Sequence, residues 1–267
     1  MDVAKAKEQA RTSWSRGEYG GLSEMLRPAA AALADACAVS AGQEVLDVAA
    51  GDGNFAVVCA AEGASVVASD LAPGMVEQGK RRTENEGFEI EWVEADAEEL
   101  PFADGRFDCV GSVFGAMLTP QPRVVAEEMF RVLRPGNTVG MTAWLPEGPT
   151  FDMFKLGRRY GPPAPDDAPR LEQWADEDTV HERLDGLANS IDMQRAELPW
   201  SADSPEDFAA RMERASPMNV TAKEQMPADD YARFREAMVD MAREWAGGDG
   251  PFTVDARYVL IVARKRG

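Results

Sequence analysis

The sequence predicts an α/β fold built on a mostly parallel sheet, and three observations support this prediction. Short β-rich runs alternate with helical patterns between residues 44 and 144. A glycine turn, Gly51-Asp52-Gly53, follows the first of these runs. A strongly apolar run over 257–264 is typical of a final core strand. Strand–helix alternation at this spacing favours parallel strands joined by right-handed crossovers, with helices on both faces of the sheet.

The first half of the chain supplies five of the expected strands, each a short run rich in β-branched or aromatic residues. Helical patterns separate these runs, and Pro135-Gly136 ends the last of the helices. The expected strands cover 44–49, 65–69, 89–94, 107–114 and 138–144, and the expected helices cover 53–62, 73–85 and 121–133.

The second half carries fewer strand patterns and more turn residues. Residues 145–170 are rich in Pro and Gly, including GPPAP at 161–165, and predict a loop region with short helical pieces. A helix is expected over 178–190 and a sixth strand over 192–199.

A further helical region precedes the final strand. Ser204, followed by Pro205 and Asp207, has the pattern of a capped helix start. Apolar residues then recur at three- and four-residue steps, which predicts one face of a long helix that packs on the core. These residues are Tyr231, Phe234, Met238, Met241 and Trp245.

Composition and charge exclude several classes of protein. The 267 residues include 28 Lys and Arg against 47 Asp and Glu, and the formal net charge of −19 repels phosphate backbones and anionic membranes. We therefore expect no nucleic-acid partner and no membrane association. A single histidine excludes metal sites built on several His ligands, and we expect no metal. Three cysteines without a CxxC pair predict reduced thiols in a cytoplasmic protein.

The glycine turn after the first strand is the most informative segment. Glycines there let the backbone pass close to a ligand, and the following helix start offers free N–H groups. Gly51, Gly53 and Ala56 formally satisfy the dinucleotide fingerprint G-x-G-x-x-G/A, which alone is weak. Asp70, at the end of the second strand, can accept hydrogen bonds from both hydroxyls of a ribose. The ligand is therefore expected to contain an adenosine-type group.

Two further acids favour a cationic sulfonium ligand over a dinucleotide. Asp47 lies inside the first strand, where a carboxylate suits an ammonium group and is awkward beside a pyrophosphate. Asp96, followed by Ala97, comes after the third strand, where a carboxylate and a backbone N–H can read the amine and ring nitrogen of adenine. S-adenosyl-L-methionine (SAM) carries a carboxylate, an ammonium group, a ribose diol and adenine.

This arrangement resembles the class I SAM-dependent methyltransferases, in the branch that carries an ELPF-type segment (methyltransferase type 11-like). The order and spacing of four stretches carry the resemblance, over roughly the first half of the chain from Val45. They are VLDVAAGDGNF at 45–55, VVASDLAPGM at 66–75, WVEADAEELPFADGRFDCV at 92–110 and EEMFRVLRPG at 127–136.

The resemblance implies a Rossmann-like seven-stranded mostly parallel sheet with helices on both faces, a helical insertion or lid before the last strands, and a final antiparallel hairpin. The N-terminal segment would close over SAM, and the product would be S-adenosyl-L-homocysteine (SAH). The residues expected to bind the cofactor are Asp47, Ala49, Gly51, Gly53, Asp70, Leu71, Met75, Asp96, Ala97, Ser112 and Phe114.

Two positions depart from the family pattern. Ala49 stands where the family usually has Gly, which is a mild change if the backbone angles of this residue are ordinary. Asn137 stands where a second Gly is common, and Asn can also adopt a positive φ.

The acceptor side is less specified by the sequence. The candidate general bases are His181, Tyr19 and Tyr160, although some acceptors need no strong base. A surface position on an acidic helix is the simpler explanation for His181. Aromatic and Met side chains outside the cofactor motifs suggest an apolar or aromatic small-molecule acceptor. The candidates that would contact it are Trp14, Met117, Trp144, Phe154 and Trp174.

We therefore expect a SAM-dependent methyltransferase (EC 2.1.1.-) that acts on a small molecule in secondary metabolism, with a homodimer as one possible assembly. The alternatives are an NAD(P)-dependent oxidoreductase and a non-enzymatic protein with the SAM-binding fold. The expected organisation is an N-terminal helical cap over 1–43, a SAM-binding Rossmann-like core over 44–144, a substrate lid or loop region over 145–191, and the remaining core strands over 192–267 with a helical insertion at 204–246.

Overall fold

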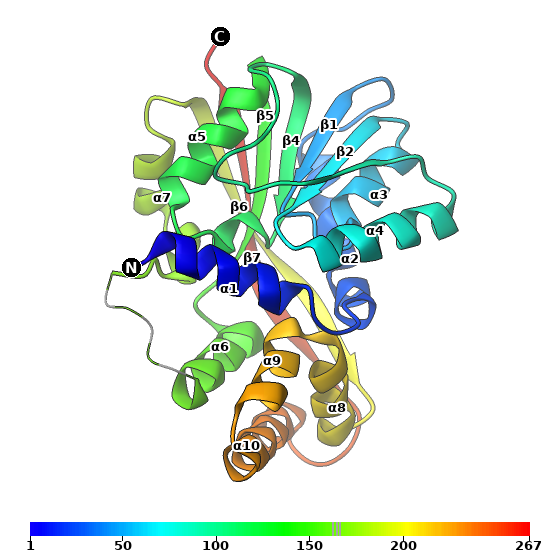
Figure 1. Cartoon of the computed structure of the whole chain (residues 1–267), viewed down its shortest axis with the longest axis vertical. Coiled ribbons are helices and arrows are strands. Elements are labelled where there is room, and N and C mark those ends of the chain that lie inside the picture. The colour runs from blue at the N-terminus through cyan, green and yellow to red at the C-terminus, as the bar shows by residue number, and fades with distance from the viewer. Residues whose placement is uncertain (162, 164, 166) are drawn as a thin grey trace.

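The computed structural model describes residues 1–161, 163, 165 and 167–267, and a seven-stranded sheet runs through these described residues (Figure 1). The strand order is β3-β2-β1-β4-β5-β7-β6. This is the predicted α/β fold class. The strands are β1 (Glu44–Val48), β2 (Ser65–Asp70), β3 (Glu91–Glu94), β4 (Phe107–Val113), β5 (Leu133–Trp144), β6 (Ala188–Ala202) and β7 (Phe252–Lys265).

The first five strands are parallel, and their order reverses between β1 and β4. Right-handed crossovers therefore place α3 (Asn54–Ala61) and α4 (Pro73–Glu86) on one face of the sheet and α5 (Pro122–Val132) on the other. A crevice forms at such a reversal, outside the carboxyl ends of the strands. The loops that follow β1 and β4 meet at this edge.

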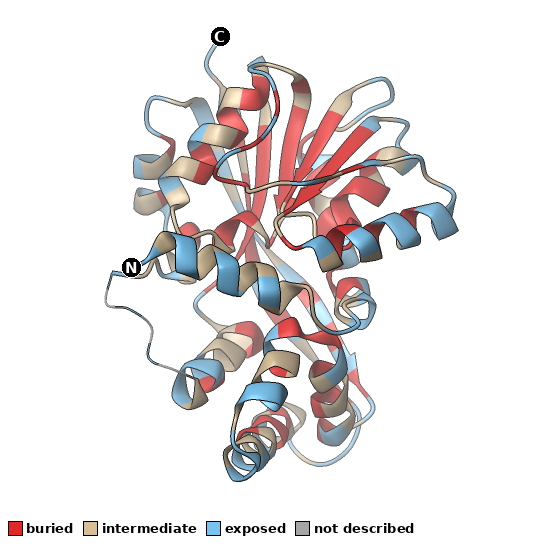
Figure 2. Cartoon of the chain, viewed as in Figure 1, coloured by how far each residue is buried: buried red, intermediate tan, exposed pale blue. Residues whose placement is uncertain are grey.

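The N-terminal helices complete the face that carries α3. Helix α2 (Gly20–Ala36) packs against α3, β4 and β5 through buried Leu and Ala side chains. In contrast, none of the described residues of α1 (Val3–Trp14) is buried. Figure 1 shows α1 crossing the molecule between the sheet and the helices below it. Figure 2 shows buried residues along the central strands and a mainly exposed or half-buried α1.

The last two strands form the expected antiparallel hairpin. Strand β7 pairs antiparallel with both β5 and β6, and it pairs with β5 only from Tyr258 onward. The other end of the hairpin extends beyond β5 and carries α8 (Pro205–Ala215), α9 (Pro217–Gln225) and α10 (Ala228–Ala246). The Ser204 side chain caps α8 by accepting the Asp207 N–H at 3.0 Å, and the Phe208 ring packs on Trp245 and Phe252.

Three sequence predictions of secondary structure were wrong. Residues 145–170 contain a regular helix, α6 (Gly148–Tyr160), whose Pro149 stands in the first turn, where a missing N–H costs little. The helix predicted over 178–190 is only α7 (Glu177–Leu184), because Gly186 adopts φ +77° and residues from Ala188 join the sheet. Strand β5 begins at Leu133 rather than residue 138. The GPPAP segment includes residues 162 and 164, which lie outside the described residues.

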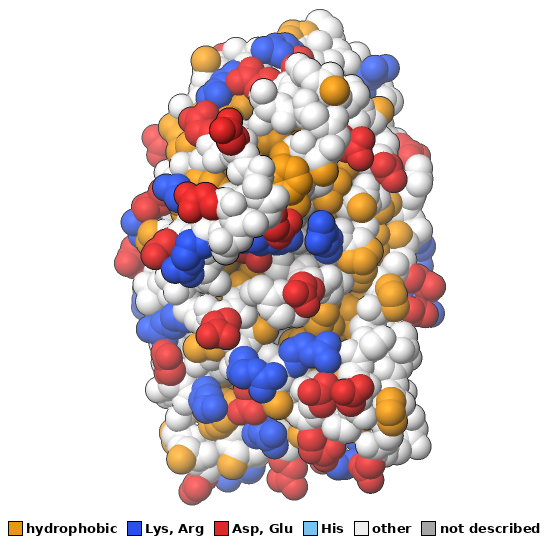
Figure 3. Space-filling view, turned by 90° about the vertical axis from the view of Figure 1, so that its right-hand side faces the viewer, with side chains coloured by type: hydrophobic (Ala, Val, Ile, Leu, Met, Phe, Trp, Pro, Cys, Tyr) orange, Lys and Arg blue, Asp and Glu red, His pale blue; other side chains and the backbone are white. Residues whose placement is uncertain are grey.

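The described residues include no helix that is both long and apolar enough to cross a membrane. The same part of the chain holds no group of His, Cys, Asp or Glu that could bind a metal ion. The three cysteines are buried free thiols, as predicted. Figure 3 shows acidic, basic and apolar side chains interspersed over one face of the molecule.

Candidate functional site

The loop between β1 and α3 has a left-handed backbone at three positions. Ala49, Gly51 and Gly53 adopt φ values of +52°, +59° and +92°. A Cβ at Gly53 would lie 2.8 Å from the Trp92 ring, and a Cβ at Gly51 would lie 3.2 Å from the Tyr19 ring. Both glycines are therefore required by close packing as well as by backbone conformation. The condition under which Ala49 would be a mild change is not met, because alanine stands here in a left-handed conformation that favours glycine.

Asp47 is buried at the start of this loop. Its Oδ2 accepts the backbone N–H of Ala56, in the first turn of α3, at 2.9 Å. Burial, with smaller effects from the charges of Asp70 and Asp52, raises the pKa of Asp47 to about 8. A carboxyl group thus occupies the helix start at which a dinucleotide would place its pyrophosphate. This geometry disfavours the oxidoreductase alternative.

Asp70 lies at the carboxyl end of β2 and faces the same loop. Its two carboxylate oxygens accept the N–H groups of Gly51 and Ala72, each at 2.9 Å. Burial raises the pKa of Asp70 to about 6 despite these hydrogen bonds. Because an ionised carboxylate has about four acceptor positions, roughly two remain for a ligand. The side chain is therefore fixed in place and still able to bind hydroxyl groups.

Asp96 is already engaged by the N-terminal helix. The Lys7 Nζ lies 2.6 Å from Asp96 Oδ2 and 2.6 Å from Glu98 Oε2. Partial burial alone would lower the pKa of Lys7, but its hydrogen bonds and charge interactions with the two carboxylates raise it. Asp96 Oδ1 accepts the Glu98 N–H at 2.9 Å. A ligand that donates a hydrogen bond to Asp96 must therefore share this carboxylate with the Lys7 ammonium group or displace it.

The segment after α1 covers the glycine loop. The Tyr19 ring lies over Gly51, and the Trp14 ring meets the Tyr19 ring edge-on with centroids 6.0 Å apart. The backbone N–H of Tyr19 donates to Gln78 Oε1 at 3.2 Å. Burial raises the pKa of Tyr19, and the charges of Asp52 and Asp70 add to this effect. The phenol therefore keeps its proton at neutral pH and can act as a hydrogen-bond donor.

The carboxyl ends of β4 and β5 carry an aromatic cluster. Phe114 adopts φ +58°, donates its N–H to Thr142 Oγ1 at 2.9 Å, and stacks on Trp144 with centroids 3.7 Å apart. The Tyr258 ring meets both rings edge-on. Ser112 is turned inward and donates to the Val48 carbonyl at 2.6 Å. Phe114 and Trp144 are thus neighbours at the sheet edge, whereas the Ser112 hydroxyl holds two strands together.

The remaining candidates for cofactor and acceptor contacts differ in position. Met75 is buried in the first turn of α4, and Ala97 is buried in the loop after β3. Leu71 is half-buried. Met117 is buried in the 3-10 turn η1 (Ala116–Leu118), while Phe154 is half-buried on α6. Trp174 is fully buried in η2 (Leu171–Ala175) beneath the Arg183 guanidinium, 4.6 Å from its ring centre. The environment of Trp174 is that of a core residue.

Two of the three candidate bases lie away from the glycine loop. His181 is on α7 with 55% of its side chain exposed, 4.0 Å from Glu177. Helix α7 packs against α5, η2 and β6, and strands β4, β5 and β7 separate β6 from β1. Tyr160 is on α6 and packs edge-on against Phe234. Of the three candidates, Tyr19 is the residue that the structure brings to the glycine loop and its acids.

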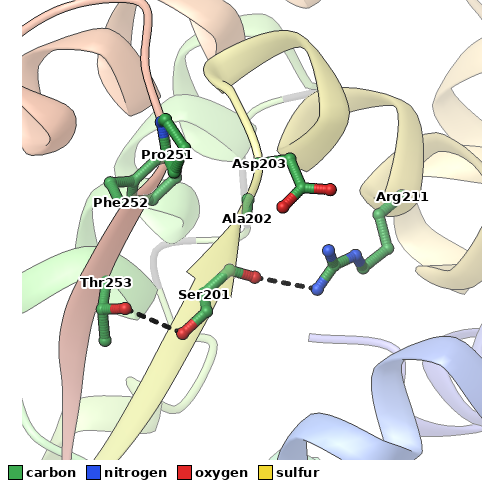
Figure 4. Close-up of a pocket in the computed structure, with 7 residues that line it drawn as sticks. All are labelled: Ser201, Ala202, Asp203, Arg211, Pro251, Phe252 and Thr253. Atoms are coloured by element: carbon green, nitrogen blue, oxygen red, sulfur yellow. Dashed lines mark hydrogen bonds between the residues drawn. The ribbon is translucent and has the colours of Figure 1, made fainter.

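A separate hollow of about 460 Å³ lies at the tip of the β6–β7 hairpin (Figure 4). Arg211 at its rim donates to the Ser201 carbonyl and to Asp207, each at 3.0 Å. The Arg211 guanidinium is thus engaged within the protein. The lining contains none of the sequence-predicted site residues and consists of Ser201, Ala202, Asp203, Arg211, Pro251, Phe252 and Thr253.

Sequence reasoning missed the basic partners of the site. Lys7 pairs with Asp96, and Arg82 on α4 pairs with Asp52 at 3.1 Å. One signal was available for Lys7, because Lys7 and Arg11 share a helix face at i, i+4 in a strongly acidic chain. For Arg82 the sequence shows only the i, i+4 pair with Glu86, since its other partners Ser23, Asp52 and Asn54 come from distant segments.

Comparisons with known proteins identify the family of this chain. A family model described as a methyltransferase domain matches residues 45–136, from β1 into β5. An uncharacterized protein of Mycobacterium tuberculosis (strain ATCC 25618 / H37Rv) is 36% identical over 189 residues, which cover 70% of this chain and 69% of that protein. A demethylmenaquinone methyltransferase of Clavibacter sepedonicus is 44% identical over 104 residues, 39% of this chain and 42% of that protein.

The fold is also shared with solved structures. The crystal structure of the YcgJ protein from Bacillus subtilis has a TM-score of 0.61 at 22% identity, over 90% of this chain and 99% of that chain. A parallel sheet with an order reversal, a glycine loop and acids at the strand ends define an α/β enzyme of the methyltransferase type. With the family model and the mycobacterial relative, they show that this chain belongs to the class I SAM-dependent methyltransferases, whose cofactor is SAM.

Proposed function

We propose that this chain transfers a methyl group from SAM to a small-molecule acceptor at the carboxyl edge of the sheet. SAM, when bound, supplies an electrophilic methyl group on a positively charged sulfur. The observation that carries the proposal is the gathering of three buried carboxyl groups, Asp47, Asp52 and Asp70, around the glycine loop. Burial raises the pKa of all three. Asp52 is already paired with Arg82, and a cationic guest beside Asp47 and Asp70 would offset the cost of ionising these two carboxyl groups.

Each acidic side chain has a distinct proposed contact. Asp70 is held by two backbone N–H groups and would accept hydrogen bonds from the ribose hydroxyls. Asp47 would face the ammonium group of the methionyl part, directly or through water. Asp96 would accept the adenine amine once Lys7 releases it, with the Ala97 N–H on the adenine ring. Leu71 and Met75 would pack on adenine, and Gly51 and Gly53 would allow the close approach of the methionyl chain.

We place the acceptor beside the Phe114–Trp144 stack, because these rings lie where β4 and β5 end. Planar aromatic walls favour an apolar or aromatic small molecule. Since Tyr19 stays protonated, its proposed role is to donate a hydrogen bond rather than to remove a proton. The protein would then act mainly by orienting the acceptor and excluding water. A role in secondary metabolism and a homodimer remain predictions from the sequence.

Isothermal titration calorimetry with SAM, SAH and NAD⁺ tests the cofactor assignment. We expect saturable binding of SAM and SAH and no binding of NAD⁺. Tight NAD⁺ binding without SAH binding would support the oxidoreductase alternative and end this proposal.

The non-enzymatic alternative needs a second measurement. Protein supplied with methyl-labelled SAM and a panel of phenols, carboxylic acids and amines should form labelled product with at least one class. The matched control is the Asp70→Asn variant, which should lose most of this activity. SAH binding without any turnover across the panel would favour a non-catalytic role.

A further inference from the structure

A buried polar cluster contacts the glycine loop through Asp52. Asp52 stands between the two left-handed glycines and is only 4% exposed. Its Oδ1 accepts the Ser23 hydroxyl at 2.5 Å and lies 3.1 Å from a guanidinium nitrogen of Arg82. Glycines impose little conformational preference on a loop, so these side-chain contacts add to the backbone hydrogen bonds that hold it in place.

Arg82 is the centre of this cluster. The same guanidinium nitrogen donates to Ser23 Oγ and to Asn54 Oδ1, each at 3.0 Å, and Arg82 Nε donates to Glu86 at 2.8 Å. Asn54 donates in turn to the Ser23 carbonyl at 2.8 Å. A single side chain of α4 therefore links α2, the glycine loop and the first residue of α3. The guanidinium is planar and presents several donors at once, which the Lys ammonium does not reproduce.

The cluster is coupled to the ligand-facing side of the loop through one residue. Gly51, next to Asp52, donates its N–H to Asp70 Oδ2 at 2.9 Å. A shift of Asp52 would therefore move the N–H that orients Asp70. Without Arg82, the Asp52 carboxylate would also be an uncompensated buried charge close to Asp47 and Asp70, and it would move toward solvent.

We propose that Arg82 is a positioning residue for the cofactor: through Asp52 it holds the glycine loop where Gly51 and Asp70 are aligned for binding. Arg82 acts from behind the loop and touches neither Asp70 nor Asp47. This inference rests on the proposed cofactor contacts, and it adds a residue that none of the sequence motifs contains.

Calorimetry with SAH on matched variants tests the inference. Arg82→Met should weaken SAH binding about ten- to hundredfold, the equivalent of one lost charge-assisted hydrogen bond, and Arg82→Lys should recover part of the loss. Arg81→Met is the control, because Arg81 is the neighbouring exposed residue and pairs only with Glu77 among the described residues. This control should bind SAH as the unmodified protein does.

Two further measurements separate positioning from a general structural role. In Arg82→Met, hydrogen exchange should accelerate at the amides of residues 51–54 but not in β1 or β4. Combining Asp52→Asn with Arg82→Met should weaken SAH binding no more than the stronger single change, since both act through one contact. If Arg82→Met does not fold, Arg82→Lys and Asp52→Asn carry the same test.

The outcomes are distinguishable. Unmodified protein that binds SAH while Arg82→Met, Arg82→Lys and Asp52→Asn bind it equally well overturns this inference alone. Additive losses in the double variant also contradict it. Unmodified protein that does not bind SAH overturns the cofactor contacts, and this inference with them.

Discussion

The Asp70→Asn substitution should make the protein progressively more stable, relative to the unmodified protein, as pH rises, and it should lower cofactor affinity. Burial moves the pKa of Asp70 from 3.8 to about 6, so the ionised carboxylate destabilises the folded state. Because the folded pKa is the higher one, the favourable contribution is full below about pH 3.8 and is lost as pH rises through about 6. Asparagine does not ionise and avoids this loss.

The magnitude follows from the two pKa values. A shift of about two units is worth about 3 kcal/mol, at about 1.4 kcal/mol per unit. Roughly half of this change falls between about pH 5 and about pH 8. Asparagine can accept from only one of the Gly51 and Ala72 N–H groups, which costs about 1–3 kcal/mol at every pH. The free energy of unfolding of the variant, relative to the unmodified protein, should therefore rise by about 1.4 kcal/mol between these pH values.

Urea denaturation at both pH values measures this difference, and the other buried acids largely cancel because both proteins contain them. The same variant should bind SAH about ten- to hundredfold more weakly, since the ribose hydroxyls lose a charged acceptor. A stability difference that does not change with pH would refute the reasoning from burial. An unchanged affinity for SAH would refute the ribose contact.

Three other outcomes are expected. Ala49→Gly should raise the free energy of unfolding by up to about 1 kcal/mol in urea denaturation, because a φ of +52° disfavours alanine. Ala38→Gly, at φ +53°, is a control outside the site. A lower stability of Ala49→Gly would contradict the inferred backbone strain. Cofactor binding near neutral pH should release close to one proton, because a nearby ammonium group would lower the pKa of Asp47 from about 8. Identical binding enthalpies in buffers of different ionisation enthalpy would show that no proton is released. Lys7→Met should speed tryptic cleavage after Arg11, because ion pairs rather than burial hold α1 on the protein. An unchanged cleavage rate would show that the Lys7 ion pairs do not hold α1 in place.

The positions of the glycine loop and of the acids near it were largely predictable because these parts lie in short, local patterns. The apolar run of β1, the glycine turn and the helix after it are consecutive, so Gly51 and Gly53 could be placed before the fold was known. Asp70 follows from the end of the next strand by the same reasoning. Parallel strands bring their carboxyl ends to one edge, which is why these separate segments meet.

The acceptor side was less predictable because its residues come from many elements. Phe114 and Trp144 stack only because β4 and β5 are neighbours in the sheet. The helix α6 was missed because the Pro and Gly content of residues 145–170 predicted a loop region, although Pro149 stands in the first turn of the helix. Trp174 is an aromatic side chain like Trp144, yet it is buried in the core beneath Arg183.

By itself, the sequence determined the α/β class, the glycine loop after the first strand and the acids at the strand ends, because periodicity and turn chemistry act over a few residues. Only the tertiary structure decided what surrounds those acids. Lys7 reaches Asp96, and Arg82 reaches Asp52, because packing brings distant segments within a few ångströms. Such pairs form only where segments that are distant in the sequence pack together, which no local pattern encodes.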